Sequence, residues 1–267
     1  MGEYSQLLPI AREAVAIGRR IIRTRVPRFV TEKSERDLVT DIDLAVEDAV
    51  REFLAEETPE IGVLGEERGL SGTDDGLWWA LDPVDGTTNF ARGIPLCGVS
   101  LGLADRRRGV VGAIDLPFLD VGYSAVDGGG TWMGDERVRV SEIRDLSGAV
   151  VSIGDFAVGE DAEGKNRVRI ALLRRLGSRV QRVRMVGTAA IDLAWVADGK
   201  LDASIILANM PWDTLAGVVL VREAGGVVLD QDGTDHTTES AATIALSPGL
   251  CEQIMTILEE SHLDSSG

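Results

Sequence analysis

The sequence predicts a mixed fold, α+β in its first half and α/β in its second, and three observations lead to this prediction. Residues 7–25 carry apolar side chains at helical spacing. Residues 97–140 alternate short strand-like runs with turn clusters, which is typical of an antiparallel meander. From about residue 148 strands and helices alternate instead. We therefore expect an N-terminal half, 1–145, and a C-terminal half, 146–267, that pack tightly as one unit.

The elements of the first half follow from apolar periodicity and turn residues. Two strands in it end at acidic residues, so the ends of those strands are where we expect chemistry. The predicted elements are a helix at 7–25, a hairpin at 29–39, a helix at 43–55 and strands at 61–64, 77–81, 98–103, 109–114 and 121–126.

The elements of the second half alternate between strand and helix. Thr188 is a good N-cap for a helix that runs to Asp198 and stops at Gly199. A polar tail is expected at 261–267. The other predicted elements are strands at 149–153, 180–186, 201–207, 227–229 and 243–246 and helices at 166–176, 214–224 and 248–260.

The charge of the chain limits its partners. A formal net charge of -17 argues against nucleic acid, whose phosphates would be repelled. An anionic substrate would also be repelled unless bound cations reverse the field locally, so divalent metal is expected. No apolar run approaches the roughly 20 residues that span a bilayer, so no membrane association is expected. Cys97 and Cys251 lie far apart without a CxxC partner, which favours a reducing, cytoplasmic compartment.

Histidine-based catalysis is the class most clearly excluded. The chain contains 2 histidines, His236 in a predicted polar turn and His262 in the predicted tail. Neither position suits a general base or a triad, so any hydrolysis would depend on carboxylates, hydroxyl groups and metal.

Residues 81–90 are the most informative segment. Asp82 and Asp85 stand where an apolar run ends, and both can aim at one hard cation. The amides of Gly86 and Thr87 stay free to meet an anion. Carboxylates beside an amide-lined anion pocket are what metal-assisted phosphate chemistry needs.

Other segments add acidic residues at the ends of elements. Glu66 and Glu67 follow the strand at 61–64, and Asp43 lies near the start of a helix. Asp213 precedes the helix at 214–224, where taken alone it is better interpreted as an N-cap. Their joint occurrence with Asp82 and Asp85 favours a metal site.

These segments strongly resemble the inositol monophosphatase family. The resemblance rests on 65–67, 82–90 and 212–217, is supported by 37–43, 186–190 and 223–226, and runs from about Lys33 to Ser247. It implies a magnesium-dependent, lithium-sensitive phosphomonoesterase that is usually a homodimer. It also implies a layered α/β/α/β/α architecture, with an antiparallel N-terminal sheet and a mixed C-terminal sheet.

The resemblance also implies roles for individual residues around two to three Mg²⁺ ions. Glu66, Asp82 and the carbonyl of Val84 would hold the first ion, and Asp82, Asp85 and Asp213 the second, with Glu66 sharing a weaker third. Thr87 and Asp43 would orient the attacking water, and Glu66 would assist catalysis. The amides of Gly86 and Thr87 would hold the phosphate. Asp85, Gly187, Thr188 and Ala189 would border the substrate.

The resemblance does not identify the alcohol part of the substrate. Inositol-specific members of the family carry a glutamate seven residues before the second-metal Asp, a position that Ile206 occupies here, and Asn209 is the nearest polar residue. The substrate could be an inositol monophosphate, histidinol phosphate, a sugar phosphate such as fructose bisphosphate, or adenosine bisphosphate. A non-catalytic member of the fold, acting through binding as a regulator or scaffold, is the alternative from another class.

Overall fold

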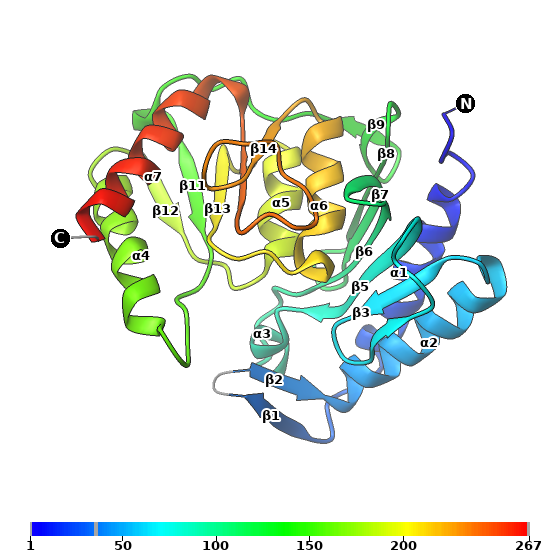
Figure 1. Ribbon diagram of the computed structural model, residues 1–267. Coiled ribbons are helices and arrows are strands. Elements are labelled where there is room, and N and C mark those ends of the chain that lie inside the picture. Colours follow the sequence, from blue (N-terminus) through cyan, green and yellow to red (C-terminus); the bar gives the residue numbers. More distant parts are fainter. Residues whose placement is uncertain (1, 35–36, 266–267) are drawn as a thin grey trace.

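Alternating layers of helices and sheets make up the structure, a computed structural model that describes residues 2–34 and 37–265. Its helices are α1 (Leu8–Thr24), α2 (Asp41–Glu57), α3 (Thr87–Ala91), α4 (Ala162–Gly177), α5 (Ala189–Ala197), α6 (Pro211–Glu223) and α7 (Cys251–Ser265), with short 3₁₀ turns η1 (Leu146–Gly148) and η2 (Pro248–Leu250). Helices α1 and α2 cover a first sheet, α5 and α6 lie between this sheet and a second one, and α4 and α7 cover the outer side of the second (Figure 1). The layered architecture expected from the sequence is thus confirmed.

The first sheet has 8 strands in the order β10-β9-β8-β7-β6-β5-β3-β4. They are β3 (Gly62–Gly65), β4 (Gly69–Ser71), β5 (Leu77–Asp85), β6 (Gly98–Asp105), β7 (Arg108–Leu116), β8 (Val121–Val126), β9 (Gly130–Met133) and β10 (Glu136–Val138). All neighbours pair antiparallel except β3 and β5, which are parallel because β4 turns back along the outer edge of β3. The predicted strand at 77–81 continues through the acidic motif to Asp85, because those residues still pair with β6.

The second sheet is mixed, as expected, with 5 strands in the order β12-β11-β13-β15-β14. They are β11 (Val150–Ile153), β12 (Arg182–Arg184), β13 (Ala203–Ile206), β14 (Val227–Leu229) and β15 (Thr243–Leu246). Strand β12 is shorter than the predicted 180–186, because it is an edge strand whose side chains are mostly exposed. The two sheets fall on either side of residue 145. A domain boundary there stays a prediction, since α6 from the C-terminal half packs on strands of the N-terminal half.

Local sequence explains most helix ends. Thr40 and Asp43 form a reciprocal capping box at the start of α2. Thr188 caps α5 as predicted, by accepting a hydrogen bond from the backbone N–H of Ile191. The predicted tail at 261–267 is wrong in its first part, because α7 continues to Ser265 and buries Ser261 completely. A separate hairpin of β1 (Val30–Ser34) and β2 (Asp37–Thr40) precedes α2, close to the predicted 29–39.

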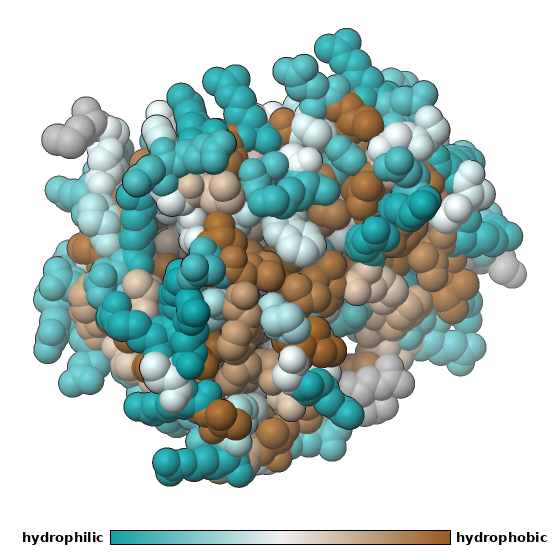
Figure 2. Space-filling model, turned by 180° about the vertical axis from the view of Figure 1, so that it is seen from behind, coloured by the Kyte–Doolittle hydropathy of each residue, from teal (hydrophilic) through white to brown (hydrophobic). Residues whose placement is uncertain are grey.

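The surface distribution of apolar groups is uneven. On the face opposite to that of Figure 1, apolar side chains gather near the centre and hydrophilic ones surround them (Figure 2). Over residues 2–34 and 37–265, no helix combines the length and the hydrophobicity that a bilayer crossing would require.

Glycines let α6 lie directly on the first sheet. A Cβ atom at Gly102 would stand 2.8 Å from the amide nitrogen of Ala216, and one at Gly112 would stand 2.4 Å from the carbonyl oxygen of Ala216. These two glycines are paired across β6 and β7, so together they form a flat surface against the helix backbone. The close approach fixes the position of the first turn of α6, which carries Asp213.

We expect Gly112→Ala to lower the free energy of unfolding by about 3 kcal/mol, because the added methyl group has to displace helix backbone. Urea unfolding followed by circular dichroism measures the change. Gly177→Ala is the matched control, since a Cβ there meets no atom within 4 Å, and it should change stability by at most about 1 kcal/mol. Equal unfolding midpoints for wild type and Gly112→Ala would contradict the close packing of α6.

Candidate active site

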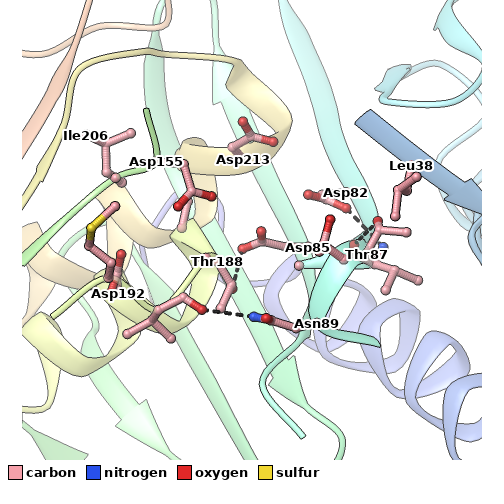
Figure 3. Close-up of a pocket in the computed structure, with 18 of the residues that line it drawn as sticks. Leu38, Asp82, Asp85, Thr87, Asn89, Asp155, Thr188, Asp192, Ile206 and Asp213 are labelled. Atoms are coloured by element: carbon pink, nitrogen blue, oxygen red, sulfur yellow. Dashed lines mark hydrogen bonds between the residues drawn. The ribbon is translucent and has the colours of Figure 1, made fainter. Parts of the chain in front are cut away.

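A cavity of about 710 Å³ lies between the end of the first sheet and the N-terminal turns of α5 and α6. Its walls come from segments far apart in the sequence, and Figure 3 shows their side chains facing a common space. The acidic residues that line it are Glu66, Asp82, Asp85, Asp155, Asp192 and Asp213. No Lys, Arg or His occurs among the lining residues that the structure describes. Both histidines of the chain therefore lie outside the cavity, as the sequence suggested.

The parallel pairing of β3 and β5 brings Glu66 and Asp82 together. Gly65 pairs with Leu81, and the N–H of Glu66 donates to the carbonyl oxygen of Leu81 at 3.2 Å. Because both strands run in the same direction, the residues that follow each strand position lie at the same edge of the sheet. An antiparallel pair would have placed these two acids at opposite ends.

A bulge in β5 brings Asp85 to the same side as Asp82. Asp82 pairs with Ser100 and Asp85 with Gly98, so three steps along β5 match two steps along β6. Two steps along a strand return to the same face, whereas three would not. The extra residue falls at Pro83–Val84, where Pro is tolerated because a bulge needs no ladder hydrogen bond.

Asp82 is the most constrained acid of the cavity. It is 2% exposed, and one carboxylate oxygen accepts a hydrogen bond from the N–H of Val84 at 3.0 Å. Burial raises its pKa well above the usual value, and the charges of Glu66, Asp85 and Asp213 raise it further. Such a set of buried, mutually repelling oxygen ligands fits a hard divalent cation, which would remove the repulsion.

Asp85 is held in place by α5. It accepts hydrogen bonds from the hydroxyl of Thr188 at 2.7 Å and from the N–H of Ala190 (Figure 3). Burial raises the pKa of Asp85 to about 6, although these hydrogen bonds oppose the shift. Thr188 therefore caps α5, as predicted, and also orients Asp85, a role that the sequence did not reveal. Its place beside the substrate stays a prediction.

Thr87 and Asp43 form the expected pair. The hydroxyl of Thr87 lies 2.9 Å from Oδ1 of Asp43 and 2.9 Å from the carbonyl oxygen of Val84. Asp43 is completely buried, and its other oxygen accepts hydrogen bonds from the N–H and hydroxyl of Thr40. Burial raises the pKa of Asp43, partly offset by these donors. One carboxylate thus caps α2 and anchors Thr87.

Glu66 lies beside a lysine that sequence reasoning did not assign. Nζ of Lys33, on the β1–β2 hairpin, lies 2.7 Å from Glu66 and 2.8 Å from Glu67. Burial raises the pKa of Glu66, and Lys33 offsets part of the shift. The hairpin thereby contributes positive charge next to the acidic edge of the first sheet.

The interpretation of Asp213 as a helix cap is wrong. Helix α6 begins earlier, at Pro211, with Met210 as the N-cap, so Asp213 lies inside the first helical turn. Its position lets its side chain line the cavity opposite Asp82 (Figure 3). Within the described part of the chain, no three His, Cys, Asp or Glu side chains are already drawn together as a closed metal centre. The acids share a cavity, and a cation would have to draw them closer.

Two glycines in the left-handed region shape the wall of the cavity that is expected to face the phosphate. Gly86 has φ 88° and precedes α3, and a Cβ there would stand 3.0 Å from the carbonyl oxygen of Leu96 and 3.3 Å from that of Gly187. Gly187 has φ 75° and leads into Thr188 and Ala189, which also line the cavity. Because α3 is only 5 residues long, its individual N–H groups matter more than its dipole.

Asn89 joins the two sides of the cavity, a role that the sequence did not reveal. Its side-chain N–H₂ donates to the carbonyl oxygen of Val186 at 2.9 Å (Figure 3) and to that of Leu96 at 2.9 Å. The one sequence feature that could have indicated this role is the position of Asn89 inside the 82–90 motif. Without these bonds, the segment before Thr188 would not be tied to α3.

The alcohol side differs from the candidates considered from sequence. Asn209 does not line the cavity: its N–H₂ donates to backbone carbonyls in the 237–240 loop, and its carbonyl oxygen accepts from Thr214. Ile206 does line it. Residues that were missed, because no local motif marks them, are Asp155, Phe156, Val158, Met185 and Asp192.

Asp192 is unusual among these residues. It is 2% exposed, and its Oδ1 has no hydrogen-bond partner in the described structure. Burial raises the pKa of Asp192 to about 8, so the carboxyl group is largely neutral at pH 7.

His236 is not in a polar turn as predicted but is buried. Its Nε2 lies 2.9 Å from Oγ1 of Thr243, and burial lowers its pKa to about 4.

Comparisons with known proteins identify the family of the chain. The profile of the Inositol monophosphatase family matches residues 3–263. A protein named Inositol-1-monophosphatase ImpA from Mycolicibacterium smegmatis is 38% identical over 229 residues, 86% of this chain and 83% of that protein. A protein named Nus factor SuhB from Pasteurella multocida is 35% identical over 230 residues, 86% of this chain and 85% of that protein.

A solved structure agrees as well. The inositol monophosphatase from Anabaena (Nostoc) sp. PCC 7120 superposes with a TM-score of 0.86 at 30% identity, covering 97% of each chain. The profile match, the relatives and the shared fold show that this chain belongs to the inositol monophosphatase family.

Proposed function

We propose that this chain, a phosphoric monoester hydrolase by its family, hydrolyses a small phosphorylated alcohol with the help of two to three Mg²⁺ ions. The observation that carries the proposal is the burial of Asp82 among Glu66, Asp85 and Asp213, an arrangement that needs a compensating cation. Glu66, Asp82, Asp85, Asp213 and the carbonyl of Val84 would hold the metal. When bound, Mg²⁺ would supply Lewis acidity and neutralise developing negative charge.

The chain itself would position the water and the phosphate. With its proton directed to Asp43 or to the carbonyl oxygen of Val84, the hydroxyl oxygen of Thr87 can accept a hydrogen bond from the attacking water. The N–H groups of Gly86 and Thr87 would donate to phosphate oxygens, which agrees with their place in the cavity wall. Thr188 would keep Asp85 oriented.

Metal removal tests the proposal. We expect EDTA to lower phosphate release from monoesters by at least about 100-fold, and Mg²⁺ in excess of EDTA to restore it. An independent readout is thermal unfolding, because a ligand at 100 times its Kd stabilises the folded state by about 2.7 kcal/mol. Phosphate release that is indifferent to EDTA, together with an unchanged Tm, would exclude a metal mechanism.

A binding function is the second candidate, and the relative named as a Nus factor is the observation in its favour. The two are separated by a screen for phosphate release across inositol monophosphate, histidinol phosphate, fructose bisphosphate and adenosine bisphosphate. Release from any of them supports the hydrolase, and release from none at saturating Mg²⁺ supports the binding protein.

Three further properties are proposed from the family resemblance. We infer a homodimer, a cytoplasmic location and inhibition by lithium. Light scattering at several protein concentrations tests the first, and fractionation of cells the second. Titration of Li⁺ into a working phosphatase assay at fixed Mg²⁺ tests the third.

A further inference from the structure

The cavity has two chemically different ends. One end contains Asp82, Asp85, Thr87 and the amides of Gly86 and Thr87, which the proposed function uses. The other end is displaced from it in Figure 3 and carries Asp155, Asp192 and Ile206. Because the phosphate is assigned to the first end, the leaving alcohol has to extend towards the second.

Asp192 gives the second end a buried carboxyl group, one oxygen of which has no hydrogen-bond partner among the described residues. Burial raises the pKa of this group, and the nearby hydroxyl of Ser152 partly offsets the shift. It comes from the first turn of α5, is 2% exposed, and has an Oδ1 atom that accepts no hydrogen bond from the described residues. Buried carboxyl oxygens in native proteins are almost always paired. Since Asp192 also lines the cavity, its missing partner is naturally supplied by a ligand.

Asp155 adds a second carboxylate from a different segment. It lies on the exposed loop after β11, and its Oδ2 would stand 3.9 Å from a Cβ placed on Gly187. Its backbone carbonyl accepts a hydrogen bond from Nε of Arg169 at 3.1 Å, so the loop is fixed to α4. The guanidinium group of Arg169 does not line the cavity and leaves the charge of Asp155 available there.

The other lining residues of this end indicate what kind of alcohol it would accept. Phe156, Met185 and Ile206 offer apolar surface for a carbon skeleton. Among the described residues that line the cavity there is no Lys, Arg or His, so a second phosphate or a carboxylate on the alcohol would meet the negative charge of Asp155 at this end. A positively charged nitrogen would meet the carboxylate of Asp155, and its charge would favour the ionised form of the neighbouring Asp192 carboxyl group.

We propose that the end of the cavity formed by Asp155, Asp192, Phe156, Met185 and Ile206 is a subsite for a leaving alcohol that carries a positively charged nitrogen on an apolar skeleton. The substrate class is therefore a phosphorylated amino alcohol, and this inference rests on the proposed hydrolase function. The reaction is ordinary hydrolysis: water adds to phosphorus, the bond from phosphorus to the alcohol oxygen breaks, and that oxygen takes a proton. Of the alcohols left open above, histidinol carries such a nitrogen, whereas the bisphosphates are disfavoured.

A pair of substrates that differ only in charge tests the subsite. Choline phosphate and 3,3-dimethylbutyl phosphate have nearly the same shape, but only the first carries a cationic head. We expect kcat/KM to be at least about tenfold higher for choline phosphate, because a desolvated charge contact is lost with the neutral analogue. Equal values for the pair, or a preference for fructose bisphosphate, would overturn the subsite.

Variants test whether Asp155 and Asp192 cause the preference for choline phosphate over its neutral analogue. Asp155→Asn is expected to reduce the ratio of the two kcat/KM values by about tenfold, and Asp192→Asn to reduce it in the same direction. Asp155 is exposed, so its variant should fold even if the buried Asp192 variant does not. Asp135→Asn, in the exposed β9–β10 turn, removes the same charge elsewhere and should leave the ratio unchanged.

Failure of the subsite is distinguishable from failure of the hydrolase function. If inositol monophosphate is hydrolysed but the ratio for the matched pair is near one and insensitive to Asp155→Asn, the hydrolase stands and the cationic subsite is rejected. If no monoester releases phosphate, the hydrolase function is rejected and the subsite inference falls with it.

Discussion

Asp82→Asn is expected to lower kcat by at least about 10³-fold, equivalent to about 4 kcal/mol of transition-state stabilisation. Asp82 is the carboxylate that both proposed metal positions share, and a neutral amide would weaken both. The same change should raise the Tm of the metal-free protein by about 2–4 °C, corresponding to about 1 kcal/mol. The reason is that Asp82 is 2% exposed and surrounded by Glu66, Asp85 and Asp213.

The sign of the stability effect follows from the direction of the pKa shift. The pKa of Asp82 is raised in the folded state, so the folded protein binds this proton more tightly than the unfolded chain. The ionised carboxylate therefore costs stability at neutral pH, and the cost disappears as the pH falls below the unfolded pKa. Asparagine removes the charge at every pH.

Steady-state kinetics and differential scanning calorimetry without metal measure the two effects of Asp82→Asn. Asp74→Asn is the control, because Asp74 is exposed in the loop before β5 and does not line the cavity. Retention of wild-type kcat by Asp82→Asn would refute the two-metal role. A lower Tm of the metal-free variant would show that the buried acids do not repel one another as inferred.

Thr87→Val should lower kcat by about 10²–10³-fold while leaving the affinity for Mg²⁺ within about threefold of wild type. The substitution keeps the volume and removes the hydroxyl that bonds Asp43 and the carbonyl of Val84, each at 2.9 Å. Water orientation is lost, but the carboxylates assigned to the metal are intact.

Thr87→Ser is the matched rescue, because it keeps the hydroxyl and removes only a methyl group. We expect its kcat to lie within about tenfold of wild type. Single-turnover phosphate release gives the chemical step, and the Mg²⁺ dependence of Tm gives the metal affinity. If Val and Ser variants were equally slow, the hydroxyl would not be the group that matters.

Local pattern was sufficient for most of the architecture. The apolar periodicity of α1, the capping residue Thr188, and the change of rhythm after residue 145 each depend on neighbours in sequence. Errors arose where partners are distant. Strand β5 runs past Leu81 because β6 pairs with it, and His236 is buried because β15 brings Thr243 against it.

The residues of the candidate site likewise fall into those that the sequence predicted and those that it did not. The 82–90 motif, Glu66 and Asp213 could be selected from sequence because their residue types and spacing are themselves the signal. Asp155, Asp192 and the pairing of Lys33 with Glu66 could not, since each lies in an ordinary local context. Asp155 and Asp192 reach the cavity because α5 and α6 pack against the first sheet and the loop after β11 lines the same space.

By itself the sequence determined the identity of the chemical groups: acidic side chains, a threonine hydroxyl, two glycines and only 2 histidines in the chain. Only the tertiary structure decided which of these groups face one another. Three residues along a regular strand would have turned Asp82 and Asp85 to opposite faces, and the bulge opposite Ser100 and Gly98 reverses this. The parallel register of β3 with β5 then places Glu66 beside them. Sheet register depends on pairing between distant segments, and therefore local sequence does not encode it.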